Sequence, residues 1–182
     1  GLKEAGLCST LEVLPAGQAS FDVVGLDLPK GRRLAQRWLA LAAHALCPGG
    51  RLFLAGQKDQ GIQSLARDAG QIFGEPAILA YRKGNRLLRF QRPAALPAQV
   101  EWWDAPGIQP GTWWEFSAVL PQAGEMKLVS LPGIFSYDRL DDGTRSLLER
   151  LQLSPADRVL DLGCGYGVIG LAAARLGVQH VD

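Results

Sequence analysis

The chain has 182 residues, of which 47% are hydrophobic and 20% charged, and its formal net charge is +1. These values are typical of a soluble globular protein with one domain, or with one small domain and part of another, and no apolar run reaches the roughly 18 residues that would span a bilayer. We therefore expect a cytoplasmic protein without a membrane partner, and the three cysteines and two histidines lack the spacing of a metal site or a disulfide framework.

The first half of the sequence predicts alternating strands and helices. Phe21–Leu28 is an apolar run rich in valine and leucine, as expected of a buried parallel strand. Apolar residues at helical spacing follow from Arg32, and Pro48-Gly49-Gly50 is expected to end this helix. His44 lies inside it, far from any nucleophile motif, and is predicted to be a packing residue. A second buried strand is predicted at Arg51–Gly56.

A second helix and a hairpin complete this half. The helix is predicted at Gly61–Phe73, and the stretch from Ala77 to Arg92 predicts a hairpin that turns at Gly84-Asn85. The order strand, helix, strand, helix and antiparallel pair predicts an α/β fold with the hairpin at the sheet edge. The Rossmann-like sheet of class I methyltransferases finishes with the same order of elements. At this level the similarity is one of topology alone.

Residues 93–125 differ in composition and are predicted to link two domains, residues 1–92 and 126–182. Six of the eleven prolines fall within forty residues from Pro93 onward, together with two tryptophan pairs. Tryptophan rings can stack on RNA bases, but in a proline-rich connector we favour docking onto a domain surface. The four rings concerned are Trp102, Trp103, Trp113 and Trp114.

The C-terminal stretch predicts a strand, a helix and then a strand-to-helix turn rich in glycine. The strand is expected at Met126–Leu131, and the helix after it has Asp142 or Thr144 as its N-cap. The sequence DRVLDLGCGYGVIGLAAARLG then predicts a strand at Arg158–Leu162 and a helix at Val168–Leu176.

The turn between these last two elements is the candidate ligand-binding loop. Its glycines, Gly163, Gly165 and Gly167, permit a ligand to approach the backbone, which side chains would block. A dinucleotide site reads G-x-G-x-x-G, and here only Gly170 can serve as the third glycine. Asp161 at the strand end would repel a pyrophosphate but suits the amino group of S-adenosylmethionine. The pattern D-x-G-C-G-x-G thus favours a site for this methyl donor over a purely structural tight turn.

Basic residues are concentrated between Lys30 and Arg92. This stretch contains twelve basic and three acidic residues, a net charge of +9, so the rest of the chain sums to −8. Such asymmetry is typical of a module that binds nucleic acid, and solvated helix faces and strand ends are the alternative. The candidate RNA-binding residues are Arg32, Arg33, Arg37, Lys58, Arg82, Lys83 and Arg86.

Two stretches, LPGIFSYDRLDDGTRSLLERL and VLDLGCGYGVIGLAAAR, resemble the start of the catalytic domain of the ribosomal small subunit methyltransferase C family. LDLPKGR and AGQKDQGIQS resemble the family's degenerate first domain. The resemblance implies two tandem methyltransferase-like domains, the N-terminal one non-catalytic and the C-terminal one binding S-adenosylmethionine. It also implies methylation of the exocyclic N2 of a guanine in 16S ribosomal RNA, with the small ribosomal subunit as the partner.

The resemblance further implies a set of cofactor-binding residues. These are Asp161, Gly163, Cys164, Gly165 and Gly167 in the loop, and Phe135, Ser136, Asp141 and Thr144 in the segment that folds over the site in such enzymes. The family's catalytic Asn-Pro-Pro-Phe motif is absent, and Asp27-Leu28-Pro29 stands at the equivalent strand end of the first domain, so no catalytic residue is predicted. Asp182 is a candidate for the acidic residue that holds the ribose hydroxyls.

Because the chain starts at Gly1 and ends at Asp182, twelve residues after Gly170, we expect both ends to be cut. We also expect the 182-residue chain alone to be inactive and to bind the methyl donor weakly or not at all. Val159, Leu160, Ile169 and Leu171 are expected to expose apolar surface through which copies associate. Alternatives are a large-subunit rRNA guanine-N2 methyltransferase, a protein-glutamine methyltransferase, or a non-catalytic RNA-binding or dimerising module.

Overall fold

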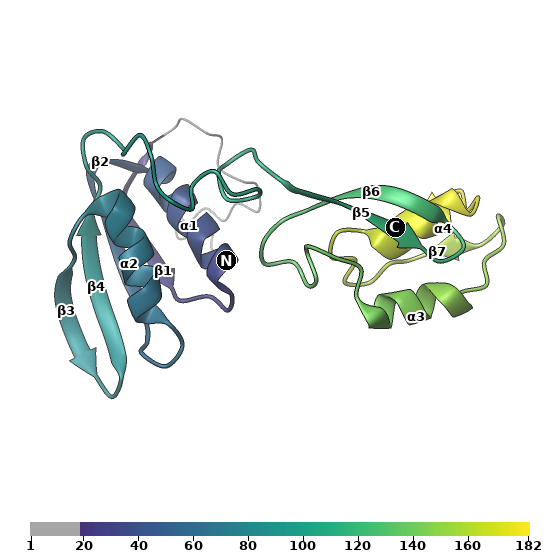
Figure 1. The fold of residues 1–182 in the computed structure, drawn as a ribbon, viewed down its shortest axis with the longest axis horizontal. Helices are drawn as coiled ribbons and strands as arrows, with labels where there is room; N and C mark the ends of the chain where they lie inside the picture. The colour runs from purple at the N-terminus through teal and green to yellow at the C-terminus, as the bar shows by residue number, and fades with distance from the viewer. Residues whose placement is uncertain (1–18) are drawn as a thin grey trace, which may run out of the picture. The chain divides into compact units, whose positions relative to one another are not determined.

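A computed structural model describes residues 19–182, which form parts of two compact units that divide between Gly111 and Thr112 (Figure 1). We call them unit 1 and unit 2 and describe each by itself. Cys8 lies outside the described residues.

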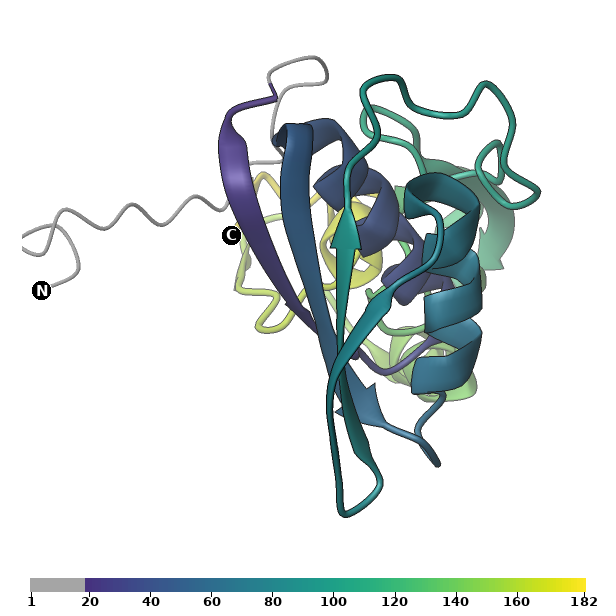
Figure 2. The ribbon, with the colours of Figure 1, turned by 90° about the vertical axis from the view of Figure 1, so that its left-hand side faces the viewer.

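Unit 1 contains a four-stranded mixed sheet with helices on one face. The strands are β1 (Phe21–Asp27), β2 (Leu46–Gln57), β3 (Ala77–Arg82) and β4 (Asn85–Gln91), in the order β1-β2-β4-β3. β1 and β2 are parallel, whereas β4 is antiparallel to both of its neighbours. α1 (Arg32–Ala45) and α2 (Ile62–Phe73) pack on the same side of the sheet (Figures 1 and 2). The predicted α/β fold class is confirmed.

The core of unit 1 lies between these helices and one face of the sheet. Leu52 pairs with Phe90 and Leu54 pairs with Leu88 across β2 and β4, and all four side chains are buried. Side chains alternate along a strand, so the intervening residues point to the other face. These are Arg51, Phe53, Ala55 and Gln57 on β2 and Asn85, Leu87, Arg89 and Gln91 on β4. We call this side the open face, because no helix in the described part of unit 1 covers it (Figure 2).

Two boundaries in unit 1 differ from the predicted ones. β2 begins at Leu46 rather than Arg51, because Leu46 already pairs with Phe21 of β1. Pro48-Gly49-Gly50 then forms an irregular stretch within the strand, with a φ of 80° at Gly49 and a register shift before Arg51 pairs with Val23. The hairpin turns at Lys83 and Gly84 rather than at Gly84-Asn85. Both residues have positive φ, 49° and 81°, as a two-residue turn with the right-handed twist of a hairpin requires.

The chain after β4 packs onto unit 1. Trp102 is only 6% exposed and joins the unit 1 core, and the Arg37 guanidinium donates a 2.7 Å hydrogen bond to the carbonyl of Gly107. The His44 ring lies 5.8 Å from that of Trp103 and 3.0 Å, Nε2 to Oε1, from Gln109. Docking was the interpretation favoured for the tryptophans, and Trp102 and Trp103 are docked in this way; His44 is a packing residue, as predicted.

Unit 2 combines a hairpin with two short helices and a small parallel pair of strands. β5 (Trp114–Leu120) pairs antiparallel with β6 (Gly124–Ser130), and β7 (Arg158–Val159) pairs parallel with β8 (His180–Val181). In the chain, α3 (Asp142–Arg150) lies between β6 and β7, and α4 (Val168–Arg175) lies between β7 and β8. The core consists of Leu120, Ala123, Leu128, Leu140, Leu148, Val168 and Ala172.

Two predictions in unit 2 need correction. The N-cap of α3 is Asp141, not Asp142 or Thr144, and its carboxylate accepts a hydrogen bond from the backbone N–H of Thr144 at 3.1 Å. The strand expected at Arg158–Leu162 is shorter, because only His180 and Val181 pair with it. Beyond Val159 the backbone continues toward the loop through one further bond, from Asp161 N to the Asp182 carbonyl at 2.7 Å.

Candidate functional site

The loop between β7 and α4 has a backbone that requires glycine. Gly163, Gly165 and Gly167 have φ values of 72°, 59° and 78°, a region that side chains other than glycine rarely adopt. A Cβ added at Gly163 or at Gly167 would meet no atom within 4 Å. The loop therefore presents bare backbone to open space at two points, as a loop that receives a ligand must.

Asp161 fixes the start of this loop with one of its two carboxylate oxygens. Its Oδ2 accepts a 3.1 Å hydrogen bond from the backbone N–H of Gly170 in α4. A Cβ at Gly170 would lie 3.1 Å from the Val181 side chain, so glycine permits this close approach. Oδ1 has no hydrogen-bond donor among residues 19–182 and remains available to a cationic ligand group.

The segment 131–141 lies against the same loop. A Cβ at Gly165 would come within 3.4 Å of the Ile134 side chain, which shows how near the segment approaches. Phe135, next to Ile134, is 77% exposed, so its ring has no place in the unit 2 core. Ser136 has a positive φ of 47°, marking a sharp bend after Phe135. Loop and segment together frame the open space above the glycines.

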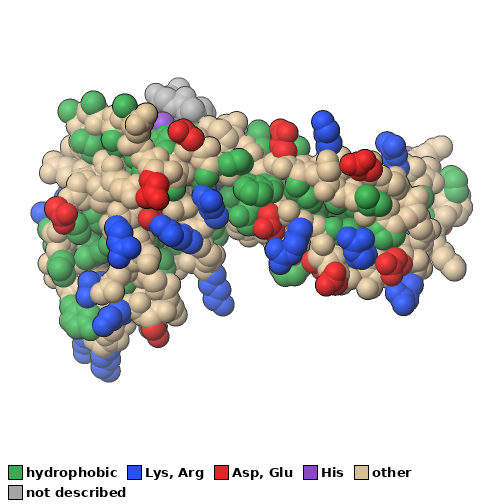
Figure 3. Space-filling view, viewed as in Figure 1, with side chains coloured by type: hydrophobic (Ala, Val, Ile, Leu, Met, Phe, Trp, Pro, Cys, Tyr) green, Lys and Arg blue, Asp and Glu red, His purple; other side chains and the backbone are tan. Residues whose placement is uncertain are grey.

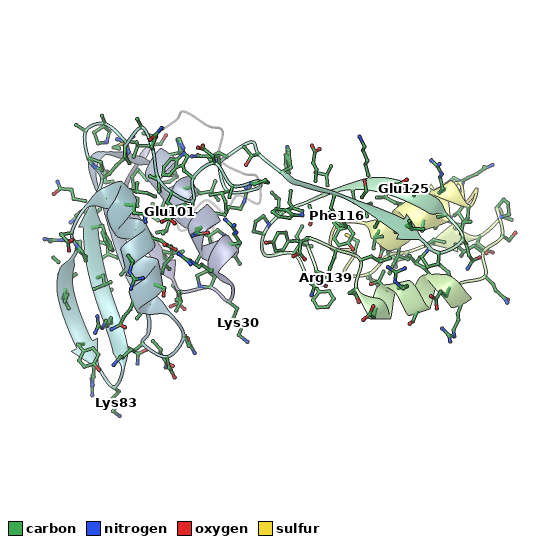
Figure 4. The ribbon with its side chains drawn as sticks, viewed as in Figure 1. Lys30, Lys83, Glu101, Phe116, Glu125 and Arg139 are labelled. Carbon is green, nitrogen blue, oxygen red and sulfur yellow. The ribbon has the colours of Figure 1, made fainter. Side chains whose placement is uncertain are left out.

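Tyr166 joins the loop to this segment and was not singled out from the sequence. Its hydroxyl donates to the carbonyl of Arg139 at 3.2 Å, and its ring packs edge-on against Phe116 of β5 with centroids 5.5 Å apart. Figure 4 marks Phe116 and Arg139 in this part of unit 2. Burial, and secondarily the negative charge of Asp141, raises the pKa of Tyr166. The sequence did contain a signal for this role, because Tyr166 is a large aromatic residue at the variable position between Gly165 and Gly167.

Asp141 and Thr144 have a structural role at the end of the segment. The hydrogen bond from the Thr144 side chain lowers the pKa of Asp141 most, desolvation of the carboxylate opposes this, and backbone N–H groups, that of Thr144 first, lower the pKa further. Asp141 lies near the loop, since its charge affects the ionisation of Tyr166. Cys164 is an exposed free thiol within the loop.

The basic candidates of unit 1 divide into an exposed set and a buried residue. Arg33, Lys58, Arg82 and Lys83 are exposed and Arg86 is half-buried. Arg37 is 4% exposed, and its burial lowers its pKa, while the carbonyl of Gly107 accepts its hydrogen bond. Arg37 therefore belongs to the packing between α1 and the chain after β4, and is not part of the basic surface predicted.

Arg32 is exposed but already has an anionic partner. It donates from Nε and Nη2 to the buried carboxylate of Asp68, at 3.1 and 2.9 Å, and this hydrogen-bonded pairing raises the pKa of Arg32. Gln36 donates to the same carboxylate at 3.1 Å. The charge of Arg32 is thus partly neutralised by Asp68.

The exposed basic residues gather at one end of unit 1. The backbone N–H of Lys58 donates to the carbonyl of Gly84 at 3.0 Å, so the end of β2 touches the hairpin tip. Lys83 at that tip and Lys30 before α1 both project from the same end of the unit (Figure 4), and Lys and Arg side chains are dense over it (Figure 3). Among residues 19–182 no group of three or more candidate metal ligands occurs, and no helix in that range is long and apolar enough to cross a membrane.

The sheet of unit 1 and the glycine loop of unit 2 define a protein of the class I methyltransferase type. Consistent with this, the family model described as methyltransferase small domain matches residues 125–181. Curated relatives include "Ribosomal RNA small subunit methyltransferase C" of Pseudomonas entomophila, 38% identical over 87% of this chain and 44% of the relative, and that of Shewanella loihica, 37% identical over 89% and 44%.

The fold matches a solved structure of the same kind, "T. thermophilus 16S rRNA N2 G1207 methyltransferase (RsmC) in complex with AdoMet and Guanosine". The TM-score is 0.80 and the identity 33%, over 99% of this chain and 48% of that one. The chain is therefore similar to ribosomal RNA small subunit methyltransferases C over most of its own length, and it spans about half the length of the relatives it matches.

Proposed function

We propose that the whole protein transfers a methyl group from S-adenosylmethionine to the exocyclic N2 of a guanine in 16S rRNA. The observation that carries this proposal is the loop in which Asp161 precedes three left-handed glycines, in a chain similar to this family. Relatives bear the corresponding name, and the solved relative is described as a complex with AdoMet and guanosine. Action on rRNA implies a cytoplasmic protein that meets the small ribosomal subunit.

The proposed cofactor site comprises the loop residues and the segment beside them. The residues present fit the group, because the backbone at Gly163 and Gly167 borders open space and one Asp161 oxygen is unpaired among described residues. Bound there, S-adenosylmethionine supplies a methyl carbon made electrophilic by its sulfonium. The residues proposed to hold it are Asp161, Gly163, Cys164, Gly165, Gly167, Phe135, Asp141 and Thr144.

Within this site the chain contributes binding and orientation. Asp161 Oδ1 would accept hydrogen bonds from the ligand ammonium, while Oδ2 holds the first turn of α4. The exposed ring of Phe135 is placed to cover apolar ligand surface, and the Asp141 cap fixes the end of the segment that carries it. Alignment of donor and acceptor is the main contribution a protein can make to methyl transfer.

We propose a division of labour between the parts of the chain. Unit 1, up to Gly111, would be a non-catalytic methyltransferase-like domain, and unit 2, from Thr112, the start of the catalytic domain. The linker predicted at residues 93–125 is divided between the two, because Trp102 and Ile108 lie in the unit 1 core and β5 pairs with β6 in unit 2. Asp27-Leu28-Pro29 at the end of β1 supports a non-catalytic first part, since it lacks the amide oxygen and the aromatic ring of the Asn-Pro-Pro-Phe motif. The exposed Arg32, Arg33, Lys58, Arg82 and Lys83, with the half-buried Arg86, would bind the phosphates of the RNA.

The test uses the full-length gene product, labelled S-adenosylmethionine and small ribosomal subunits that lack guanine N2 methylation. We expect N2-methylguanosine in the 16S rRNA digest by mass spectrometry. Asp161→Ala should abolish it, whereas Arg150→Gln on the exposed side of α3 should not. Label in large-subunit rRNA or in a protein instead would keep the methyl donor and replace the substrate, and no label anywhere would overturn the proposal.

A further inference from the structure

A cavity of about 430 Å³ with a largely apolar lining opens on unit 1. It lies where the parallel strands β1 and β2 end, the position at which open α/β sheets bind ligands. Its lining includes Asp27 at the end of β1, Gln57 at the end of β2, and Arg82 and Asn85 on either side of the hairpin turn. Of these residues, the function proposed above uses only Arg82, as one of the phosphate-binding cations.

Strand register aligns the cavity residues in two rows across the open face. Asp27 pairs with Ala55, Ala55 with Leu87, and Leu87 with Ala80, which gives one row over all four strands. The next row consists of Gln57, Asn85 and Arg82. The first row is therefore an apolar floor that ends in a carboxylate, and the second is a polar border that ends in a guanidinium.

The Asp27 carboxylate lacks a cationic partner. Its Oδ1 accepts only a 3.1 Å hydrogen bond from the adjacent Leu28 N–H, and it forms no ion pair within residues 19–182, although this end of unit 1 is strongly basic. Arg86 is engaged with the Tyr81 ring, 5.6 Å from its centroid, and the Asn85 amide donates to the hairpin carbonyls of Arg82 and Lys83. Asp27 is thus a hydrogen-bond acceptor without a strong donor, at an end of unit 1 that is rich in basic side chains.

This combination selects a particular ligand chemistry. The basic rim, with Lys58 and Lys83 beside the cavity, attracts a polyanion. The small Ala55 and Ala80 leave room for a flat ring to lie on the floor. A carboxylate accepts two hydrogen bonds from adjacent donors, and guanine alone among the RNA bases has two adjacent donors, N1–H and the N2 amine, on its Watson–Crick edge.

We propose that this cavity binds one unstacked guanine nucleotide of a single-stranded RNA segment. The guanine edge meets Asp27, its ring lies on Ala55, Leu87 and Ala80, and Arg82 and Lys83 hold the flanking phosphates. β1 and β3 lie three strand spacings, ~14 Å, apart, which leaves Asp27 and Arg82 on opposite sides of this floor. The site deepens the proposed function, resting on RNA as the partner, and is a recognition site that performs no methylation.

Fluorescence anisotropy of the 182-residue chain with labelled single-stranded RNA tests the proposal. The probes are uridine tracts that carry one central guanosine, inosine or adenosine. Guanosine should bind most tightly, and inosine, which lacks the N2 amine, should lose part of the gain. We expect Asp27→Asn to reduce the preference for guanosine over adenosine about tenfold, as the loss of a bidentate base contact does. The matched control Asp59→Asn removes the same charge from an exposed position outside the cavity and should keep the preference.

A phosphate contact has a different signature. Arg82→Gln should weaken all three RNAs equally and lower the slope of log affinity against log salt by about one. Equal affinities for guanosine and adenosine probes with the unaltered chain, or equal effects of Asp27→Asn and Asp59→Asn, would overturn the proposal. Competition by guanosine 5′-monophosphate at the RNA's own affinity would overturn the assignment to an RNA strand in favour of a free nucleotide.

The same variants separate this site from the methyl transfer. Circular dichroism melting of each variant, which alters a surface side chain, verifies folding. A guanosine preference that depends on Asp27, without methyl transfer by the full-length product, would leave the cavity proposal standing and remove the proposed reaction. Methyl transfer by the full-length product, with no guanosine preference in the binding assay, would leave the proposed reaction standing and remove the cavity proposal.

Discussion

The hydroxyl of Tyr166 donates a 3.2 Å hydrogen bond to the backbone carbonyl of Arg139, which links the glycine loop to the segment beside it. The Tyr166 ring also contacts Phe116 of β5 edge-on, at 5.5 Å between centroids. One residue at the variable position of the loop therefore connects three parts of unit 2. The loop conformation is coupled through it to the position of residues 131–141.

Removing only the hydroxyl should loosen this coupling. For Tyr166→Phe we expect the KM for S-adenosylmethionine of the full-length product to rise about two- to fivefold with little change in kcat, since a net hydrogen bond is worth ~1 kcal/mol or less at a partly exposed site. Steady-state methylation kinetics measure both constants. Tyr81→Phe is the matched control, because it removes the same atom from an exposed ring of unit 1. A fall in kcat with unchanged KM would contradict a positioning role.

The Asp141 cap should make the stability of α3 depend on pH. The pKa of Asp141 is lowered chiefly by the hydrogen bond from Thr144, so its stabilising effect is present above the ordinary carboxyl pKa and is lost as pH falls through the lowered value. Asp141→Ala should cost ~1 kcal/mol of unfolding free energy at pH 7.

Asp141→Asn separates the charge from the cap. An asparagine also caps a helix, but it does not titrate, so its urea-unfolding curve should lose less stability than that of the unaltered protein between neutral and acid pH. Parallel pH dependence of the two proteins would contradict the role assigned to Asp141.

A methyl group on the loop should block ligand approach more than it destabilises the fold. Gly167→Ala places a side chain at a φ of 78°, with an expected strain of ~1–2 kcal/mol, and its Cβ would occupy the open space where the ligand is proposed to bind. We expect calorimetry on the full-length product to show at least a tenfold loss of S-adenosylmethionine affinity.

Gly70→Ala in α2 provides the comparison. Its φ is not positive and a Cβ there would meet no atom within 4 Å, so this substitution should stabilise unit 1 by ~0.5–1 kcal/mol without affecting the ligand. Unchanged affinity in Gly167→Ala would remove the loop from the proposed site.

The sequence was sufficient for elements that depend on local pattern. The order of strands and helices in unit 1 follows from periodicity and from Pro and Gly breakers, and the glycine loop follows from its own motif. The exact turn was missed because the two positive φ values fall on Lys83 and Gly84, and a lysine gives no signal for that conformation.

Contacts between distant residues could not be predicted in the same way. The sequence does not distinguish Arg37 from the surface cations. Only the folded chain shows its hydrogen bond to the carbonyl of Gly107, 70 positions away. Tyr166 likewise meets Arg139 and Phe116 across 27 and 50 positions. The cavity at Asp27 depends on strand order, since β4 and not β3 lies next to β2, and strand order is a property of the whole sheet.

The Asp68 carboxylate provides the strongest test of the unit 1 core. It is 1% exposed and receives hydrogen bonds from Arg32 and from the buried Gln36 amide. Asp68→Ala leaves Gln36 without its partner inside the core, so we expect a loss of ~2–3 kcal/mol in the free energy of unfolding. Asp59→Ala, at an exposed site, should change it by less than ~0.5 kcal/mol.

Since Asp68 partly neutralises Arg32, Arg32→Gln should reduce the salt slope of RNA binding less than Arg33→Gln does, although the two residues are adjacent. Equal slopes would mean that Arg32 binds phosphate despite its buried partner.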